Sequence, residues 1–172
     1  VETIEGARWV WAHKTILQLA VMLGLFNFAA IMATTILILY SQEILGLSAA
    51  GHGLLMTAGA LGGVLGGLIS PAIAARLGRR ASLLTAIVVS TIHFLLIAMT
   101  SSALVVAFAL FLEMLAALLW NVVTVSYRQR LIPDDLLGRV NSIYRFFGWG
   151  TMPLGALVGG WIDADRLRNL VS

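Results

Sequence analysis

Long stretches of this chain carry no charge. No Lys, Arg, Asp or Glu lies between Lys14 and Glu43, between Glu43 and Arg76, or between Arg80 and Glu113. Each stretch is longer than the roughly 20 apolar residues with which a helix crosses a hydrocarbon layer about 30 Å thick. Because backbone groups in lipid must be hydrogen-bonded within the segment, these stretches are predicted to be membrane helices. The sequence therefore predicts an all-α, polytopic membrane bundle whose first partner is the lipid bilayer.

Composition supports this class and argues against others. The chain is 60% hydrophobic and 11% charged, whereas globular domains are about 45–50% apolar and about 25% charged. Its net charge of +3 does not indicate nucleic-acid binding, because the arginines fall in short clusters between apolar runs. There is no cysteine, and no HExxH, GxSxG or phosphate-loop motif. We therefore expect no enzyme, no metal site and no cofactor.

Five membrane helices are predicted, at about 16–40, 54–74, 82–99, 103–125 and 141–162. The third and fourth are joined by a tight turn at 100–102, so they should form an antiparallel hairpin. The turn at 41–53 is longer and polar, and it contains no Lys or Arg.

Orientation follows from the Lys and Arg residues in short loops. One side of the predicted bundle holds the N-terminal segment and the clusters at 76–80 and 128–139. The other side holds only Arg166 and Arg168, which Asp163 and Asp165 offset. We predict a multi-pass protein of the cell (inner or plasma) membrane, with the N-terminus of this segment in the cytoplasm.

The chain has the features of a piece of a longer protein. It begins at Val1 rather than Met, contains an odd number of predicted helices, and stops about ten residues after its last apolar run. The alternative is a complete small protein of five helices.

Glycines follow helical spacing in two of the predicted helices. Gly59, Gly63 and Gly67 are spaced four residues apart, and Gly62 with Gly66 forms a second ridge beside them. Small residues at this spacing let helix backbones approach closely in lipid. The fifth predicted helix repeats the pattern after a proline that should bend it, with Pro153, Gly155 and Gly159. These ridges are either rocking contacts of a moving protein or ordinary tight packing.

Two loops carry a resemblance to a known family. The segment ARLGRRASLL, at 75–84, resembles the signature cytoplasmic loop of the major facilitator superfamily. The matching residues are Arg76, Gly78, Arg79 and Arg80. Pro71 stands where the family has its first Gly, and Ala75 stands where it has an Asp, which puts a charge latch at this loop in doubt.

The second loop narrows the resemblance. RQRLIPDDLLGRVNSIYRFFGWGTMPLGALVGGW, at 128–161, contains Gly138 and Arg139 and looks like the loop between helices ten and eleven of the siderophore-exporter and macrolide-efflux branch. EGARWVWAHKTILQLAVM, at 5–22, is similar to the approach to helix seven in that branch. The resemblance implies helices seven to eleven of the C-terminal half, with the first six helices and the twelfth missing.

The resemblance also implies an arrangement. The family fold consists of two six-helix bundles, each built of inverted three-helix repeats, around a central cavity. Helices seven and ten line that cavity, eight and eleven contact the opposite half, and nine lies outside. The missing N-terminal half would then be the main partner of this chain.

Glu113 is the carboxylate inside the fourth predicted helix. An ionisable residue in a membrane span costs about 2.5 kcal/mol or more, and by default it marks a substrate or proton path. Its helix face also carries small and polar residues, namely Ala109, Ala116, Ala117, Trp120 and Thr124, with Asn121 on the flank. The opposite side carries Leu104, Phe108, Phe111, Leu115, Leu118 and Val122, and is predicted to face lipid. The alternative is a structural carboxyl that is hydrogen-bonded to a neighbouring helix.

His93 lies in the third predicted helix and could pair with Glu113 across the hairpin. Counted from the turn, His93 is about eight residues deep and Glu113 about twelve, which at ~1.5 Å per residue leaves a mismatch of roughly 6 Å. We therefore favour a buried histidine with one hydrogen bond over a proton relay.

Three other polar or aromatic residues are candidates for the substrate path. Asn27 shares a face of the first helix with Gly24 and Thr34 and is a plausible cavity contact. Trp120 either stacks on an aromatic or amphipathic substrate or fills space, and Asn121 lies beside it. Arg145 is expected to reach the cytoplasmic surface.

The leading hypothesis is a secondary transporter that exports small amphipathic molecules, driven by a proton gradient. This half would rock against the missing half to give alternating access. The competing class is a membrane scaffold or accessory subunit that does not transport.

Overall fold

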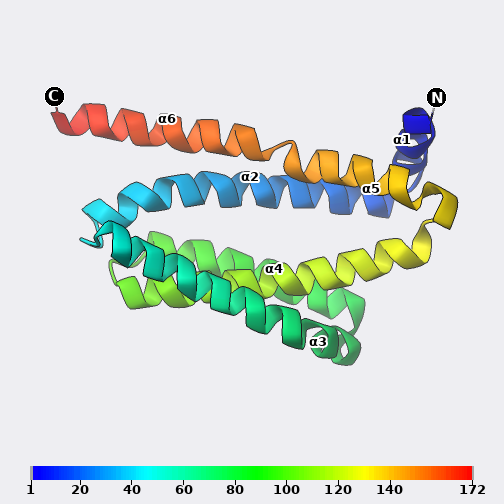
Figure 1. Cartoon of the computed structure of the whole chain (residues 1–172), viewed down its shortest axis with the longest axis horizontal. Coiled ribbons are helices and arrows are strands. Elements are labelled where there is room, and N and C mark those ends of the chain that lie inside the picture. The colour runs from blue at the N-terminus through cyan, green and yellow to red at the C-terminus, as the bar shows by residue number, and fades with distance from the viewer. Residues whose placement is uncertain (1, 172) are drawn as a thin grey trace. The chain divides into compact units, whose positions relative to one another are not determined.

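The computed structural model describes residues 2–171, with side chains described for 6–165, and these residues form helices joined by short turns without strands (Figure 1). The all-α prediction is confirmed. The helices are α1 (Glu2–Ala12), α2 (Lys14–Glu43), α3 (Ala49–Ala98), α4 (Ala103–Leu131), α5 (Asp134–Trp149) and α6 (Met152–Val171).

Within the described residues, three helices are long and apolar enough to cross a membrane, namely α2, α3 and α4. At 50 residues, α3 is long enough for two crossings, and Gly78 interrupts it with φ 74° and ψ 170°. The first leg, 49–77, contains the second predicted helix, and the second leg, 79–98, contains the third except for its last residue, Met99. At ~1.5 Å per residue, even the shorter leg spans about 30 Å, the thickness of the hydrocarbon layer.

The chain reverses at Gly78. A Cβ at Gly59 would contact Leu110, whereas one at Gly66 would contact Leu115, so the first leg runs parallel to α4. The second leg reaches α4 through the tight turn at 99–102 and runs antiparallel to it. The corner therefore consists of one residue, and its positive φ is a conformation that glycine adopts without the clash that a Cβ would cause.

The chain divides into two compact units. The second unit runs from Tyr40 to Tyr127 and contains the two legs of α3, most of α4 and the end of α2. Two contacts hold its ends. The guanidinium of Arg79 lies 4.2 Å from the centre of the Tyr127 ring, beside the Gly78 corner. At the opposite end, the Tyr40 hydroxyl donates to the carbonyls of Ile97 and Thr100.

The first unit contains α1, α5, α6 and most of α2. α1 packs on α5, where a Cβ at Gly6 would lie 3.0 Å from the Cβ of Arg139. α5 and then α6 run along α2 (Figure 1). A Cβ at Gly155 would collide with the carbonyl oxygen of Phe28, and one at Gly159 would lie 2.9 Å from that of Met32. These two glycines therefore let α6 approach the backbone of α2 closely.

The fifth predicted helix, at 141–162, is not continuous. α5 closes with the Gly150 amide donating to Phe146, and α6 begins two residues later. Pro153 causes the interruption, because it has no amide hydrogen for the carbonyl of Trp149 and its ring clashes with that carbonyl in a helix. The sequence predicted a bend here, whereas the structure has a break just before the proline.

Two helical segments, α1 and the first half of α5, lie outside the predicted membrane helices. α5 begins at Asp134, so Gly138 and Arg139 lie in a helix rather than in a loop. The signal was present, since Pro133 followed by Asp134 and Asp135 is a typical helix start in which two carboxylates face the positive end of the helix dipole. α1 is the other such segment.

Of the two glycine ridges on α3, the one with Gly62 and Gly66 forms the close contact with α4. A Cβ at Gly62 would collide with the carbonyl oxygen of Phe111, and one at Gly66 would lie 2.9 Å from the Cα of Leu115. By contrast, the nearest atoms to a Cβ at Gly59 or Gly63 lie at 3.5 and 3.6 Å, which is ordinary contact. A Cβ at Gly67 would meet no described atom within 4 Å.

Candidate functional site

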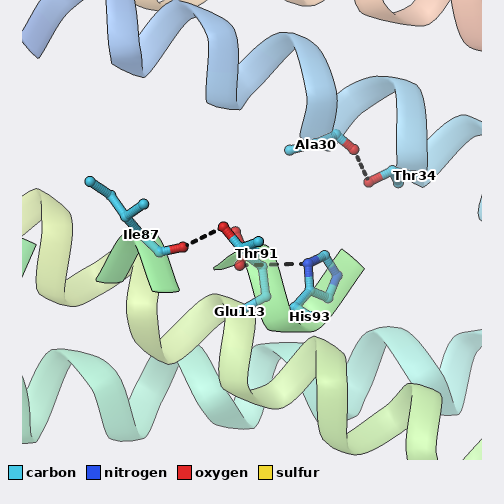
Figure 2. A network of polar contacts seen from close by, with 6 residues as sticks. All are labelled: Ala30, Thr34, Ile87, Thr91, His93 and Glu113. Atoms are coloured by element: carbon cyan, nitrogen blue, oxygen red, sulfur yellow. Dashed lines mark hydrogen bonds and ion pairs between the residues drawn. The ribbon is translucent and has the colours of Figure 1, made fainter. Parts of the chain in front are cut away.

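The candidate site is the pair of titratable side chains inside the second unit. His93 lies on the second leg of α3 and Glu113 on α4, and Nδ1 of the imidazole is 3.6 Å from Oε2 of the carboxylate. Figure 2 shows the carboxylate directed at the ring. The separation is within ion-pair range and longer than a direct hydrogen bond. A small side-chain rotation, or one water molecule, would complete proton transfer between the two groups.

The estimated depth mismatch did not prevent this contact. Side chains on a helix lean toward its N-terminus. The N-terminus of α4 lies at the 99–102 turn, so Glu113 leans toward the turn. The second leg of α3 ends at that turn, so His93 leans away from it. Both side chains therefore move toward the same depth, which offsets the roughly 6 Å between their backbones.

The pair is buried and distant from other charges. The side chain of His93 is 6% exposed and that of Glu113 is 18% exposed. Along the second leg and α4, the nearest other charged residues are Arg80 and Arg128, which lie more than ten residues away on each helix. The remaining histidine of this unit, His52, accepts or donates a hydrogen bond with Ser41 at 2.9 Å near the start of α3. The imidazole of His93 and the carboxylate of Glu113 are therefore the charged partners available to each other on these two helices.

The hydroxyl of Thr91 lies near the pair but is bonded within its own helix. It donates to the Ile87 carbonyl at 2.9 Å, as Figure 2 shows. Because a backbone acceptor occupies this hydroxyl, the imidazole is the polar partner that the structure gives to Glu113.

The predicted faces of α4 are partly correct. The face of Glu113 is buried at Ala109, Ala116, Trp120 and Thr124, in agreement with the prediction. On the opposite side, Leu104 and Phe108 are exposed. However, Phe111, Leu115 and Leu118 lie against the glycines of α3 rather than facing lipid. A helix wheel could not reveal this, because leucine suits both a lipid contact and a glycine groove.

Asn27 lies in the first unit and is engaged by the helix break. Its side-chain amide donates to the Gly148 carbonyl at 2.7 Å, in the last turn of α5. The Thr151 hydroxyl, in the break itself, donates to the Gly24 carbonyl at 2.7 Å. Polar side chains that satisfy backbone groups near a break are the usual way in which a proline is tolerated in a membrane helix. This placement gives Asn27 a contact that joins two helices, and its predicted contact with a substrate cavity stays a prediction.

The other predicted site residues are not brought together. Trp120 is buried, and Asn121, next to it on α4, is exposed. The three signature-loop arginines, Arg76, Arg79 and Arg80, are exposed, and the guanidinium of Arg79 lies over the ring of Tyr127. Among the described residues, no three His, Cys, Asp or Glu residues are grouped so that they could hold a metal ion.

Comparison with known families gives a match over most of the chain. The family model described as Major Facilitator Superfamily matches residues 16–166. The matched range includes His93, Glu113 and both arginine-rich segments. No curated protein and no solved structure matches the chain in the comparisons.

Proposed function

The chain belongs to the major facilitator superfamily of membrane transporters, and from that premise we propose that it serves a proton-coupled secondary transporter exporting small amphipathic molecules. This chain would supply part of one half of that transporter. The other half, against which it rocks in alternating access, would lie outside this sequence.

The observation that carries the proposal is the 3.6 Å contact between His93 and Glu113. A carboxylate and an imidazole that share one proton carry no net charge, whether the proton is on oxygen or on nitrogen. Adding a second proton, or removing the first, leaves a net charge in a region of low dielectric constant, which is costly. A conformation that opens the pair to water is then favoured, so proton binding can shift the balance between two conformations.

The substrate class and direction rest on the resemblance to the siderophore-exporter and macrolide-efflux branch. The residues that carry this resemblance are those of the 128–161 segment, and residues 134–149 of that segment form α5. The exported molecules of such proteins are amphipathic, and we propose the same chemical class for this chain.

The test is uphill transport by the full-length protein in proteoliposomes with an imposed pH gradient. Glu113→Gln keeps the shape and hydrogen-bonding capacity of the side chain but removes its titration. We expect this variant to insert and to bind substrate, while uphill flux falls to the level of empty vesicles. Substrate exchange without a gradient should persist, because that exchange requires no proton release.

The matched control is Glu43→Gln, which makes the same change at an exposed carboxylate at the end of α2. It should transport like the wild type once flux is normalised to inserted protein. Wild-type uphill flux in Glu113→Gln would contradict the proton-carrier role. In that case Glu113→Leu should raise the thermal stability, since a merely structural buried polar group has been replaced by an apolar one.

A further inference from the structure

Arg128 is a buried cation with an unused hydrogen-bond donor. It lies in the last turn of α4 with 9% of its surface exposed. Its guanidinium lies 3.6 Å from the centre of the Tyr144 ring. Stacking uses the face of the guanidinium, whereas its five N–H groups point outward in its plane. The Nε group is buried and has no hydrogen-bond partner among the described residues. A buried charged donor without an acceptor is unfavourable, so an acceptor is expected.

A second arginine lies beside the first. Arg145 follows Tyr144 in α5, is exposed, and lies 4.8 Å from the centre of the Trp149 ring. Because the Arg128 guanidinium lies over the ring of Tyr144, the residue that precedes Arg145, two like charges lie near each other and repel. The acidic residues of α5 are in its first turn, about 15 Å along the helix axis from Arg145. Within the described side chains, neither arginine forms an ion pair. Two cations without a counter-charge attract an anion.

The position of the two arginines indicates where the anion comes from. Arg128 lies three residues before the end of a helix long enough to cross the membrane, which is the level of the lipid headgroups. Trp149, beside Arg145, is half exposed, and tryptophan is enriched at that level. The arginine distribution predicts that this is the cytoplasmic side, where anionic lipids give the leaflet its negative surface potential.

We propose that Arg128 and Arg145 form a binding site for a phosphate-bearing anion, which in the membrane is the phosphate of an anionic lipid headgroup. The exposed guanidinium of Arg145 contacts the phosphate first, and a turn of the Arg128 side chain brings its buried Nε–H to the phosphate as the second donor. The planar fork of N–H groups in arginine fits phosphate oxygens with two parallel hydrogen bonds. The bound phosphate neutralises the repulsion between the two guanidiniums and joins the end of α4 to α5. This site is independent of the His93–Glu113 pair.

The test measures lipid binding by the full-length protein in phosphatidylcholine mixed micelles. Phosphatidylglycerol is titrated in, and native mass spectrometry counts the lipids that are retained. Arg145→Gln and Arg128→Gln should each weaken the tightest phosphatidylglycerol site by about fivefold, the effect of one arginine near an anionic surface. Arg130→Gln, an exposed arginine in the same turn of α4, should leave that site unchanged.

A second arm distinguishes the source of the phosphate. Inorganic phosphate at millimolar concentration, added without phosphatidylglycerol, should not raise the melting temperature of the wild type. If phosphate alone raises it in the wild type and not in Arg145→Gln, the site is real but its ligand is soluble. Equal phosphatidylglycerol affinity in the wild type and Arg145→Gln would overturn the proposal, as would an equal loss in Arg130→Gln. Arg145 is exposed, so this variant decides the matter even if Arg128→Gln does not fold.

Discussion

At the scale of single residues, Asn27 shows how a polar side chain on α2 joins that helix to an interrupted neighbour. Its amide donates to the Gly148 carbonyl at 2.7 Å, and Gly148 lies in the last turn of α5, one residue before that helix ends. The bond joins α2 to the broken helix at the point where regular backbone bonding stops. Lipid offers no water that could replace the Asn27 amide, so loss of this hydrogen bond leaves the Gly148 carbonyl without the Asn27 donor.

We therefore predict that Asn27→Ala destabilises the full-length protein. Hydrogen bonds between membrane helices contribute about 0.6 kcal/mol on average and up to about 1.7 kcal/mol. We expect the upper part of that range, because the bond is short and its acceptor lies beside a break. The measurement is the midpoint of unfolding in a denaturing detergent. Gln18→Ala, at an exposed position of the same helix, should not change the midpoint, and an equal shift in both variants would contradict this account.

The same scale shows why the His93–Glu113 contact was underestimated from the sequence. Counting residues from the turn measures the depth of the backbone, and the count itself was reasonable. The contact depends on the direction of the side chains, which lean in opposite senses in two antiparallel helices. The sequence could therefore indicate two buried titratable groups on neighbouring helices, but residue counting alone could not give the 3.6 Å separation.

At the scale of helices, the glycine ridges illustrate another limit of sequence analysis. Two glycine ridges lie side by side on α3, one with Gly59, Gly63 and Gly67 and the other with Gly62 and Gly66. Both ridges follow the four-residue spacing of a helix face. Only the rotation of α3 about its axis decides which ridge meets α4, and the spacing carries no information about that rotation. In the structure the Gly62–Gly66 ridge takes the close crossing, whereas Gly67 lies in open space.

This difference gives a prediction for two alanine variants. Gly62→Ala places a Cβ against the carbonyl oxygen of Phe111, and we expect it to destabilise the bundle by about 1–3 kcal/mol through overpacking. Gly67→Ala adds the same methyl group in open space, and it should be neutral or stabilise by up to about 1 kcal/mol, since alanine favours helix.

Thermal unfolding and the yield of monodisperse full-length protein measure both variants. Equal behaviour would mean that α3 and α4 do not cross at Gly62.

At the scale of the whole molecule, the charge-free runs were sufficient to predict an all-helical membrane protein. Four of the five predicted spans lie in α2, α3 and α4, which are the described helices long and apolar enough to cross a membrane. The fifth predicted span is divided at 150–151, just before Pro153, and neither α5 nor α6 meets that criterion. Pro153 predicts a disturbance of the helix, but a proline can either bend or break a helix, and the sequence pattern does not distinguish the two outcomes.

The predicted orientation can be tested by cysteine labelling, since this segment contains no native cysteine. Cysteines at Ser48 and Ser101, both exposed, should react with a membrane-impermeant reagent applied outside intact cells. Cysteines at Gln129 and Ala81, also exposed, should react only after the cells are opened. Ser82 is unsuitable for this purpose, because it is buried and its hydroxyl donates to the Gly78 carbonyl. Labelling of a cysteine at position 129 or 81 from outside intact cells would contradict the predicted orientation and indicate the opposite one.

The single-residue corner at Gly78 has a mechanical consequence. Because the corner consists of one residue, the conformation of Gly78 fixes how the second leg is rotated about its axis relative to the first leg. Each residue added to a helix turns everything beyond it by about 100°. The number of residues between Gly62 and His93 therefore sets the angle between the close crossing and the titratable pair. A single insertion between Gly78 and His93 would turn the imidazole away from Glu113 by about 100°, together with the other residues beyond the insertion.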